Sequence, residues 1–196
     1  MKKFLGVVFV LCCLLMPQIV SAEKTDWADK NFNFKAVRKI VLHNIQTETT
    51  LGNVGKIQQQ KMLSSYLDGA KKLKCEVVSD GEGDLIVECK ITKWSNNFYI
   101  IPERTVWEQK TMYRTRRDRD GNRYEEKYYV TVPVTYPPRR VDVSDLIVNF
   151  EVYDAAGNLV FGREDNRTRE DAEAQIGMFG RMCNSFFSDF GKKIKK

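Results

Sequence analysis

Two long β-prone stretches on either side of Asp120–Gly121 constrain this chain more than any other sequence feature. Residues 105–134 are rich in threonine, tyrosine and valine, interspersed with charged side chains. Asp-Gly is favoured in two-residue hairpin turns because such turns need positive φ angles. We therefore expect residues 105–134 to form a long antiparallel hairpin that protrudes beyond a compact core.

Pairing Arg119 with Asn122 across this turn fixes an expected register. In that register, side chains that attract one another meet across the strands. The expected pairs are Tyr113 with Tyr128, Arg116 with Glu125, and Asp118 with Arg123.

Two segments repeat apolar residues at three- and four-residue steps, which is typical of amphipathic helices. The first covers residues 56–73. The second begins near Thr168, which forms a capping-box-like pattern with Asp171, and continues to the C-terminal lysines. We expect both helices to pack on a core. A helix lying on a membrane surface is the alternative for the second.

Short β-prone runs provide the rest of the fold. Residues 38–42 suit a buried strand, and residues 75–78 and 85–94 suggest a hairpin. Residues 141–153 and 159–163 suggest another hairpin, with its alternate apolar residues buried. The expected buried residues are Leu146, Val148, Phe150 and Val152. The fold class is thus a two-layer α+β sandwich, with a mostly antiparallel or mixed sheet and two helices on one face.

Residues 1–22 have the pattern of a secretory signal peptide. Lys2 and Lys3 precede an apolar run over residues 4–16, and small residues lead up to Ala22. We predict cleavage after Ala22 and a secreted or periplasmic location.

The mature chain, residues 23–196, is expected to be a single α+β domain without a transmembrane span, because no later apolar run has the length of one. An uncleaved anchor is the alternative to cleavage. Lipid attachment at Cys12 is less favoured, because the bulky Leu11 precedes it.

Cleavage leaves Cys75, Cys89 and Cys183. If residues 75–78 and 85–89 form a hairpin, Cys75 lies opposite Cys89, and a disulfide is possible in an oxidising compartment. A one-residue slip would leave both as buried thiols. Cys183 lies on the apolar stripe of the second helix, where we expect it to pack in the core.

The basic excess of the mature chain is concentrated in residues 101–140, which hold ten Lys or Arg and six Asp or Glu. This hairpin could bind an acidic glycan or an anionic lipid surface. The candidate binding residues are Arg114, Arg116, Arg117, Arg119, Arg123, Tyr113 and Tyr128. The alternative is a solvated hairpin whose charges pair with one another.

Enzyme motifs are not recognisable. His43 is the single histidine, and no metal-ligand cluster, phosphate loop or nucleophile motif accompanies it. Acidic pairs such as Asp142 and Asp145 keep a hydrolase open as a third hypothesis. We assign no catalytic, cofactor or metal residue and expect no enzymatic activity.

Three segments resemble uncharacterised small secreted bacterial proteins and predicted lipoproteins. They are residues 27–34 (WADKNFNF), the strand 84–94 and the hairpin 152–161. Distant relatives of those proteins include the curli-secretion lipoprotein and the periplasmic N-terminal domain of the Tol translocation protein. The resemblance implies an α/β sandwich that acts outside the cytoplasm in binding or assembly, and it transfers no catalytic residue.

The leading hypothesis is therefore a non-catalytic binding or assembly module of the bacterial cell envelope. Its partner would be an envelope protein or an anionic polymer or surface, and no nucleic-acid partner is expected. The oligomeric state is left open.

Overall fold

The computed structural model describes residues 21–51, 54–170 and 175–195. The chain divides into two units: one comprises the residues up to Asn97 and from Asp142 onward, and the other is Phe98–Val141. The predicted signal peptide lies almost wholly outside the described residues, so the leader, its cleavage and the expected location stay predictions.

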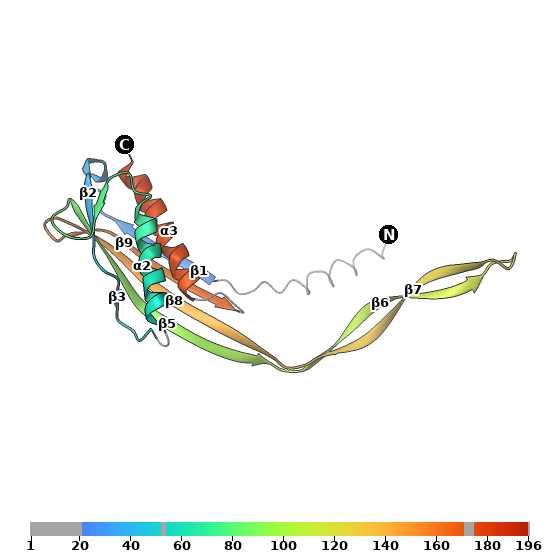
Figure 1. Cartoon of the computed structure of the whole chain (residues 1–196). Helices are drawn as coiled ribbons and strands as arrows, with labels where there is room; N and C mark the ends of the chain where they lie inside the picture. Colours follow the sequence, from blue (N-terminus) through green and yellow to red (C-terminus); the bar gives the residue numbers. More distant parts are fainter. Residues whose placement is uncertain (1–20, 52–53, 171–174, 196) are drawn as a thin grey trace. The chain divides into compact units, whose positions relative to one another are not determined.

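The first unit is an α+β sandwich in which α2 and α3 cover one face of a mixed sheet (Figure 1). The strand order is β1-β9-β8-β5-β2-β4, and the short β3 pairs with β5. The strands are β1 Ser21–Ala28, β2 Lys39–Leu42, β3 Gln46–Thr47, β4 Glu76–Val78, β5 Leu85–Ile101, β8 Arg139–Asp154 and β9 Leu159–Glu170. The helical elements are the 3-10 helix η1 Phe34–Ala36, α2 Lys56–Ala70 and α3 Gln175–Ile194. Together with a separate two-stranded sheet, β6 Arg104–Arg117 and β7 Arg123–Tyr136, this confirms the predicted fold class.

The core lies between the sheet and the two helices. The predicted alternation of β8 is confirmed: Leu146, Val148, Phe150 and Val152 are fully buried. Opposite them, α3 contributes a row of phenylalanines, and the ring of Phe186 stacks on that of Phe150 with 4.2 Å between centroids. The helices also pack on each other closely, since a Cβ at Gly69 would lie 2.8 Å from Cδ2 of Phe187.

The predicted start of the second helix is wrong. β9 continues to Glu170, and Thr168 is a strand residue whose hydroxyl donates to Asp145 at 2.7 Å instead of capping a helix. Asp171 lies outside the described residues, and the described part of α3 begins at Gln175.

The predicted hairpin between residues 75–78 and 85–94 is also wrong. β2 lies between β4 and β5 and pairs in parallel with both, so that Val41 is level with Val78 on one side and Ile86 on the other. Because a strand separates them, β4 and β5 do not pair in the way that would set Cys75 opposite Cys89. Both cysteines are free thiols in the structure.

The link between β4 and β5 passes close to β2, which explains its composition. A Cβ at Gly83 would lie 2.8 Å from Cγ2 of Val41 and 3.2 Å from the carbonyl oxygen of Lys39. The carboxylate of Asp84 accepts hydrogen bonds from the backbone amides of Arg38 at 2.7 Å and Lys39 at 2.9 Å. Gly83 and Asp84 hold the link against the start of β2. Their sequence pattern is the same as that of a hairpin turn, although the link does not form one.

Candidate functional site

The second unit is built around an antiparallel ribbon formed by β6 and β7, which we call the ribbon. Fourteen residues of each strand are paired, from Arg104 with Tyr136 to Arg117 with Arg123. Pro102 lies just before β6, and Pro137 and Pro138 lie just after β7. A proline has no backbone N–H to donate to a ladder, and these three lie where the pairing of β6 with β7 ends.

The turn of the ribbon has three residues rather than two. Gly121 adopts a φ of +86°, and its amide donates to the carbonyl of Asp118 at 3.2 Å. The carboxylate of Asp118 accepts from the amides of Asp120 at 2.9 Å and Asn122 at 2.8 Å. These bonds, led by that of Asn122, hold the pKa of Asp118 below its usual value. The same arrangement recurs between β8 and β9, where Gly157 has a φ of +85°.

This turn shifts the register by one residue from the predicted one. Arg116 lies opposite Tyr124 instead of Glu125, and Arg117 instead of Asp118 lies opposite Arg123. The prediction assumed that Asp120 and Gly121 were the two central residues of the turn. In the structure glycine is the left-handed residue that ends a three-residue loop, which adds one residue between the strands.

Because side chains alternate along a strand, the register divides the ribbon into two faces. One face, which we call the valine face, is apolar in its middle. Its central residues are Val106, Val130, Val132, Val134, Met112 and Tyr128, together with Glu108 and Lys110. The opposite face, which we call the aromatic face, carries Trp107, Tyr113 and Tyr129 among threonines.

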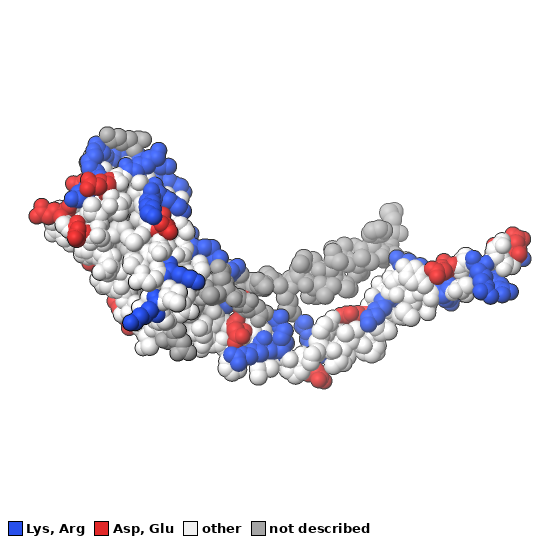
Figure 2. Space-filling model, in the orientation of Figure 1, with Lys and Arg blue, Asp and Glu red and all other residues white. Residues whose placement is uncertain are grey.

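The predicted anion-binding residues do not converge on one surface. Arg114, Arg116 and Tyr128 lie on the valine side, and Arg117, Arg123 and Tyr113 lie on the aromatic side. Arg119 is in the turn. Figure 2 shows basic atoms gathered near this end of the ribbon, with acidic atoms beside them.

Arg114 and Arg116 are already engaged within the ribbon. The Nε atoms of both lie 2.6 Å from Oε2 of Glu126. Arg114 also lies over the ring of Tyr128, with its guanidinium carbon 5.2 Å from the centroid. The hydrogen bond from Arg114 holds the pKa of Glu126 below its usual value, so this carboxylate is ionised at neutral pH.

Arg117 and Arg123 are in a different situation, because the register places these two like charges directly across from each other on the aromatic face. Such a cross-strand pair is unfavourable in isolation. Lys127, whose ammonium lies 5.3 Å from the ring centroid of Tyr129, adds a further positive charge to this face. This end of the aromatic face therefore carries three positive side chains and one negative side chain, Glu125.

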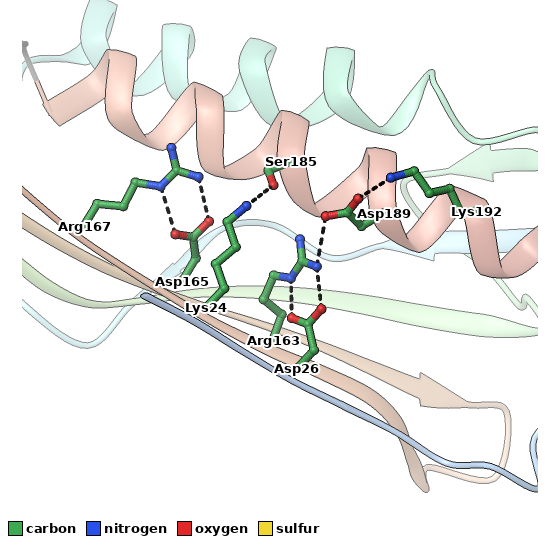
Figure 3. A network of polar contacts seen from close by, with 8 residues as sticks. All are labelled: Lys24, Asp26, Arg163, Asp165, Arg167, Ser185, Asp189 and Lys192. Atoms are coloured by element: carbon green, nitrogen blue, oxygen red, sulfur yellow. Dashed lines mark hydrogen bonds and ion pairs between the residues drawn. The ribbon is translucent and has the colours of Figure 1, made fainter. Parts of the chain in front are cut away.

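A polar network between the sheet edge and α3, which includes the buried Arg163 and Asp165, was not predicted (Figure 3). Arg163, with a side chain only 2% exposed, binds both carboxylate oxygens of Asp26 at 2.6 Å. The same guanidinium contacts Asp189 of α3 at 3.2 Å, and Lys192 binds Asp189 at 2.7 Å. Burial opposes the charge on Arg163, but Asp26 and Asp189 outweigh it and raise its pKa.

Two further contacts extend this network along the same edge. The fully buried Asp165 forms a bidentate pair with Arg167, with both distances 2.9 Å. Lys24 of β1 donates to the hydroxyl of Ser185 at 2.6 Å. The network therefore fastens β1 to β9 and α3. The sequence contained a signal for this network. Residues 161, 163, 165 and 167 alternate onto the buried face of β9, and three of them are charged, which indicates that they need charged partners there.

His43 lies on the sheet face opposite the helices, beside the ion pairs that Lys90 makes with Glu88 and Glu151. Its Nδ1 is 3.3 Å from Glu88, whose carboxylate is 3.1 Å from Lys90. Lys90 also contacts Glu151 at 2.6 Å, and this hydrogen bond raises the pKa of Lys90. His43 thus contacts a surface chain of ion pairs through Glu88.

A groove of about 350 Å³ lies between α2 and the segment around β3. It is lined by Asn44, Ile45, Thr47, Leu51, Gln59, Gln60, Met62 and Leu63. None of these side chains ionises near neutral pH. Within the described ranges there is also no cluster of three or more His, Cys, Asp or Glu that could hold a metal ion, and no helix with the length and apolarity of a membrane span.

Comparisons with known proteins gave structural matches only. No family model and no curated protein matches the chain. The PelC dodecamer from Paraburkholderia phytofirmans matches with a TM-score of 0.48 and 10% identity, over 87% of this chain and 98% of that one. A leucine-to-methionine variant of the same PelC dodecamer gives a TM-score of 0.47, with the same identity and coverage.

A PDZ domain protein from Parabacteroides distasonis matches with a TM-score of 0.39 and 8% identity, over 91% of this chain and 38% of that one. At these values no residue's role is transferred to this chain. The resemblance to the curli-secretion lipoprotein and the Tol domain stays a prediction.

Proposed function

We propose that this chain is a non-catalytic binding and assembly module of the bacterial cell envelope, and that the ribbon is its binding element. The observation that carries the proposal is the exposure of large apolar side chains on both faces of the ribbon. Trp107 is 69% exposed, Tyr113 is 62% exposed and Met112 is 45% exposed. Exposed apolar surface of this kind is typical of interaction sites.

The size of the ribbon supports the same conclusion. An isolated two-stranded sheet is only marginally stable in water, and three or more strands or a packed face are usually needed. This ribbon has fourteen paired residues on each strand. A partner that covered either face would stabilise it.

A shortened ribbon tests the proposal. Removing residues 108–115 together with 125–132 takes eight residues from each strand, which preserves the alternation of faces, the turn and the pairing of Trp107 with Pro133. We expect the mature wild-type chain to retain envelope components in affinity capture and the shortened chain to retain much less, because Met112, Tyr113 and the central rows of both faces are removed.

The control is Ile57→Ser, which removes a side chain that is 76% exposed on α2. We expect this variant to retain the same components as the wild type. Equal retention by the wild-type and shortened chains, with both shown to be folded by circular dichroism, would overturn the proposal.

The opposed Arg117 and Arg123 favour a second candidate, binding of an anionic polymer or lipid surface by the aromatic face. We expect Arg117→Ser with Arg123→Ser to weaken retention on heparin or anionic vesicles and to reduce its dependence on salt. The matched control is Arg114→Ser with Arg116→Ser, which removes the same charge from residues that Glu126 already neutralises in part. An equal loss in both double variants would show a general charge effect and reject the site.

A further inference from the structure

Four successive cross-strand rows of the valine face each carry at least one apolar side chain. These rows are Val106 with Val134, Glu108 with Val132, Lys110 with Val130, and Met112 with Tyr128. The valines at 130, 132 and 134 are partly exposed, and Val106 is 40% exposed. Apolar side chains in such a continuous stripe gain stability when they are removed from water.

The two charged residues within this stripe are arranged symmetrically about its centre. Glu108 and Lys110 are neighbours on β6, each opposite a valine of β7. The carboxylate of Glu108 also accepts a hydrogen bond from the hydroxyl of Tyr136, which lies on the same face. A two-fold axis perpendicular to the strands and midway between the Glu108 and Lys110 rows would exchange these two positions.

That symmetry makes the four central rows of the face complementary to themselves, whereas the next rows outward bring Arg104 over Arg114 of the second copy. If a second ribbon packs against it about this axis, Glu108 of each copy lies over Lys110 of the other. The same operation places Val132 over Val130, Val106 over Met112 and Val134 over Tyr128 of the second copy. Like charges are thus kept apart at the centre, and apolar side chains meet apolar side chains.

We propose that two copies of this chain pair through the valine faces of their ribbons, forming two packed layers of two strands each. The proposal deepens the proposed function, on which it rests, by naming a second copy as the partner of one face. A two-fold contact of this kind uses the same surface on both copies and closes on itself. The layers would lie about 10 Å apart, as packed sheets do.

The aromatic face has no comparable self-complementarity. Its turn end carries three positive side chains, Arg117, Arg123 and Lys127, and one negative side chain, Glu125. In the proposed dimer this face stays exposed on the outside of both layers. It is therefore available to an envelope component while the valine face holds the second copy.

Sedimentation velocity of the full mature chain over a wide concentration range tests the dimer. We expect a concentration-dependent dimer for the wild type. Val132→Lys should raise its dissociation constant by at least about tenfold, because the added ammonium would be packed against Val130 of the second copy. The matched control is Thr131→Lys, the adjacent residue on the aromatic face, which should leave the dissociation constant unchanged.

A charge exchange keeps the test informative even if Val132→Lys disturbs the ribbon. Glu108→Lys alone and Lys110→Glu alone place like charges over each other and should weaken the dimer. The double variant restores opposite charges in the proposed arrangement and should dimerise more strongly than either single variant. A wild-type chain that is monomeric throughout, or a double variant no better than the single ones, would overturn the proposal.

The outcomes separate this proposal from the proposed function. A monomeric wild type that captures envelope components only with its full-length ribbon would reject the dimer and leave the proposed function standing. A wild-type dimer whose capture does not depend on the ribbon would reject the proposed function. Wild-type monomers whose valine face binds another envelope protein would show that the occupant is a different chain and would reject the second copy.

Discussion

At the scale of single residues, Asp84 shows how a side chain that looks like part of a turn can organise a sheet. It is exposed, but its carboxylate binds two successive amides at the start of β2. These backbone hydrogen bonds, first that of Arg38 and then that of Lys39, lower the pKa of Asp84. The ionised form is therefore the one that the folded state favours.

This arrangement predicts a stability difference that depends on pH. Because the folded pKa is lowered, the contribution of Asp84 is present above its unfolded pKa of about 3.9 and is lost as pH falls through the folded value. We expect Asp84→Ala to lower the free energy of unfolding by about 1 kcal/mol at pH 7, a modest value because the group is exposed. Urea unfolding at a series of pH values should show this difference shrinking below about pH 4.

The control for this prediction is Asp80→Ala, which changes an exposed aspartate in the same link. Asp80→Ala should change the free energy of unfolding little at pH 7 or at pH 3. A loss for Asp84→Ala that is the same at pH 7 and at pH 3 would contradict the assigned role of the carboxylate.

At the scale of elements, the periodic patterns of apolar residues correctly predicted which face of α3 and of β8 is buried. The stripe of α3 and the alternation of β8 follow from burial on one face, and the core residues 146, 148, 150 and 152 were identified correctly. Strand pairing is different, because it depends on contacts between distant residues. Nothing local in residues 75–94 records that β2 lies between β4 and β5.

The ribbon illustrates the same limit within the candidate site. Its existence followed from the β-prone stretches and the turn, but its register depended on which residues form the turn. A shift of one residue turns each pairing into a different one and redistributes the arginines between the two faces. The ribbon therefore lies in the predicted segment, but its arginines are divided between two faces, and their binding role stays a prediction.

At the scale of the whole molecule, the two units differ in how their apolar side chains are used. In the first unit the large apolar residues of β8 and α3 are buried between sheet and helices, and a charged network fastens β1 to the same core. In the second unit Trp107, Tyr113 and Met112 remain exposed. We therefore assign stability to the first unit and binding to the ribbon of the second.

Site-specific photo-crosslinking tests this assignment most directly. A photoreactive residue would replace either Tyr113 of the ribbon or Trp27 of β1, which are 62% and 52% exposed. We expect covalent adducts with an envelope component from position 113 and none above background from position 27. Adducts from position 27 alone would contradict the assignment of binding to the ribbon.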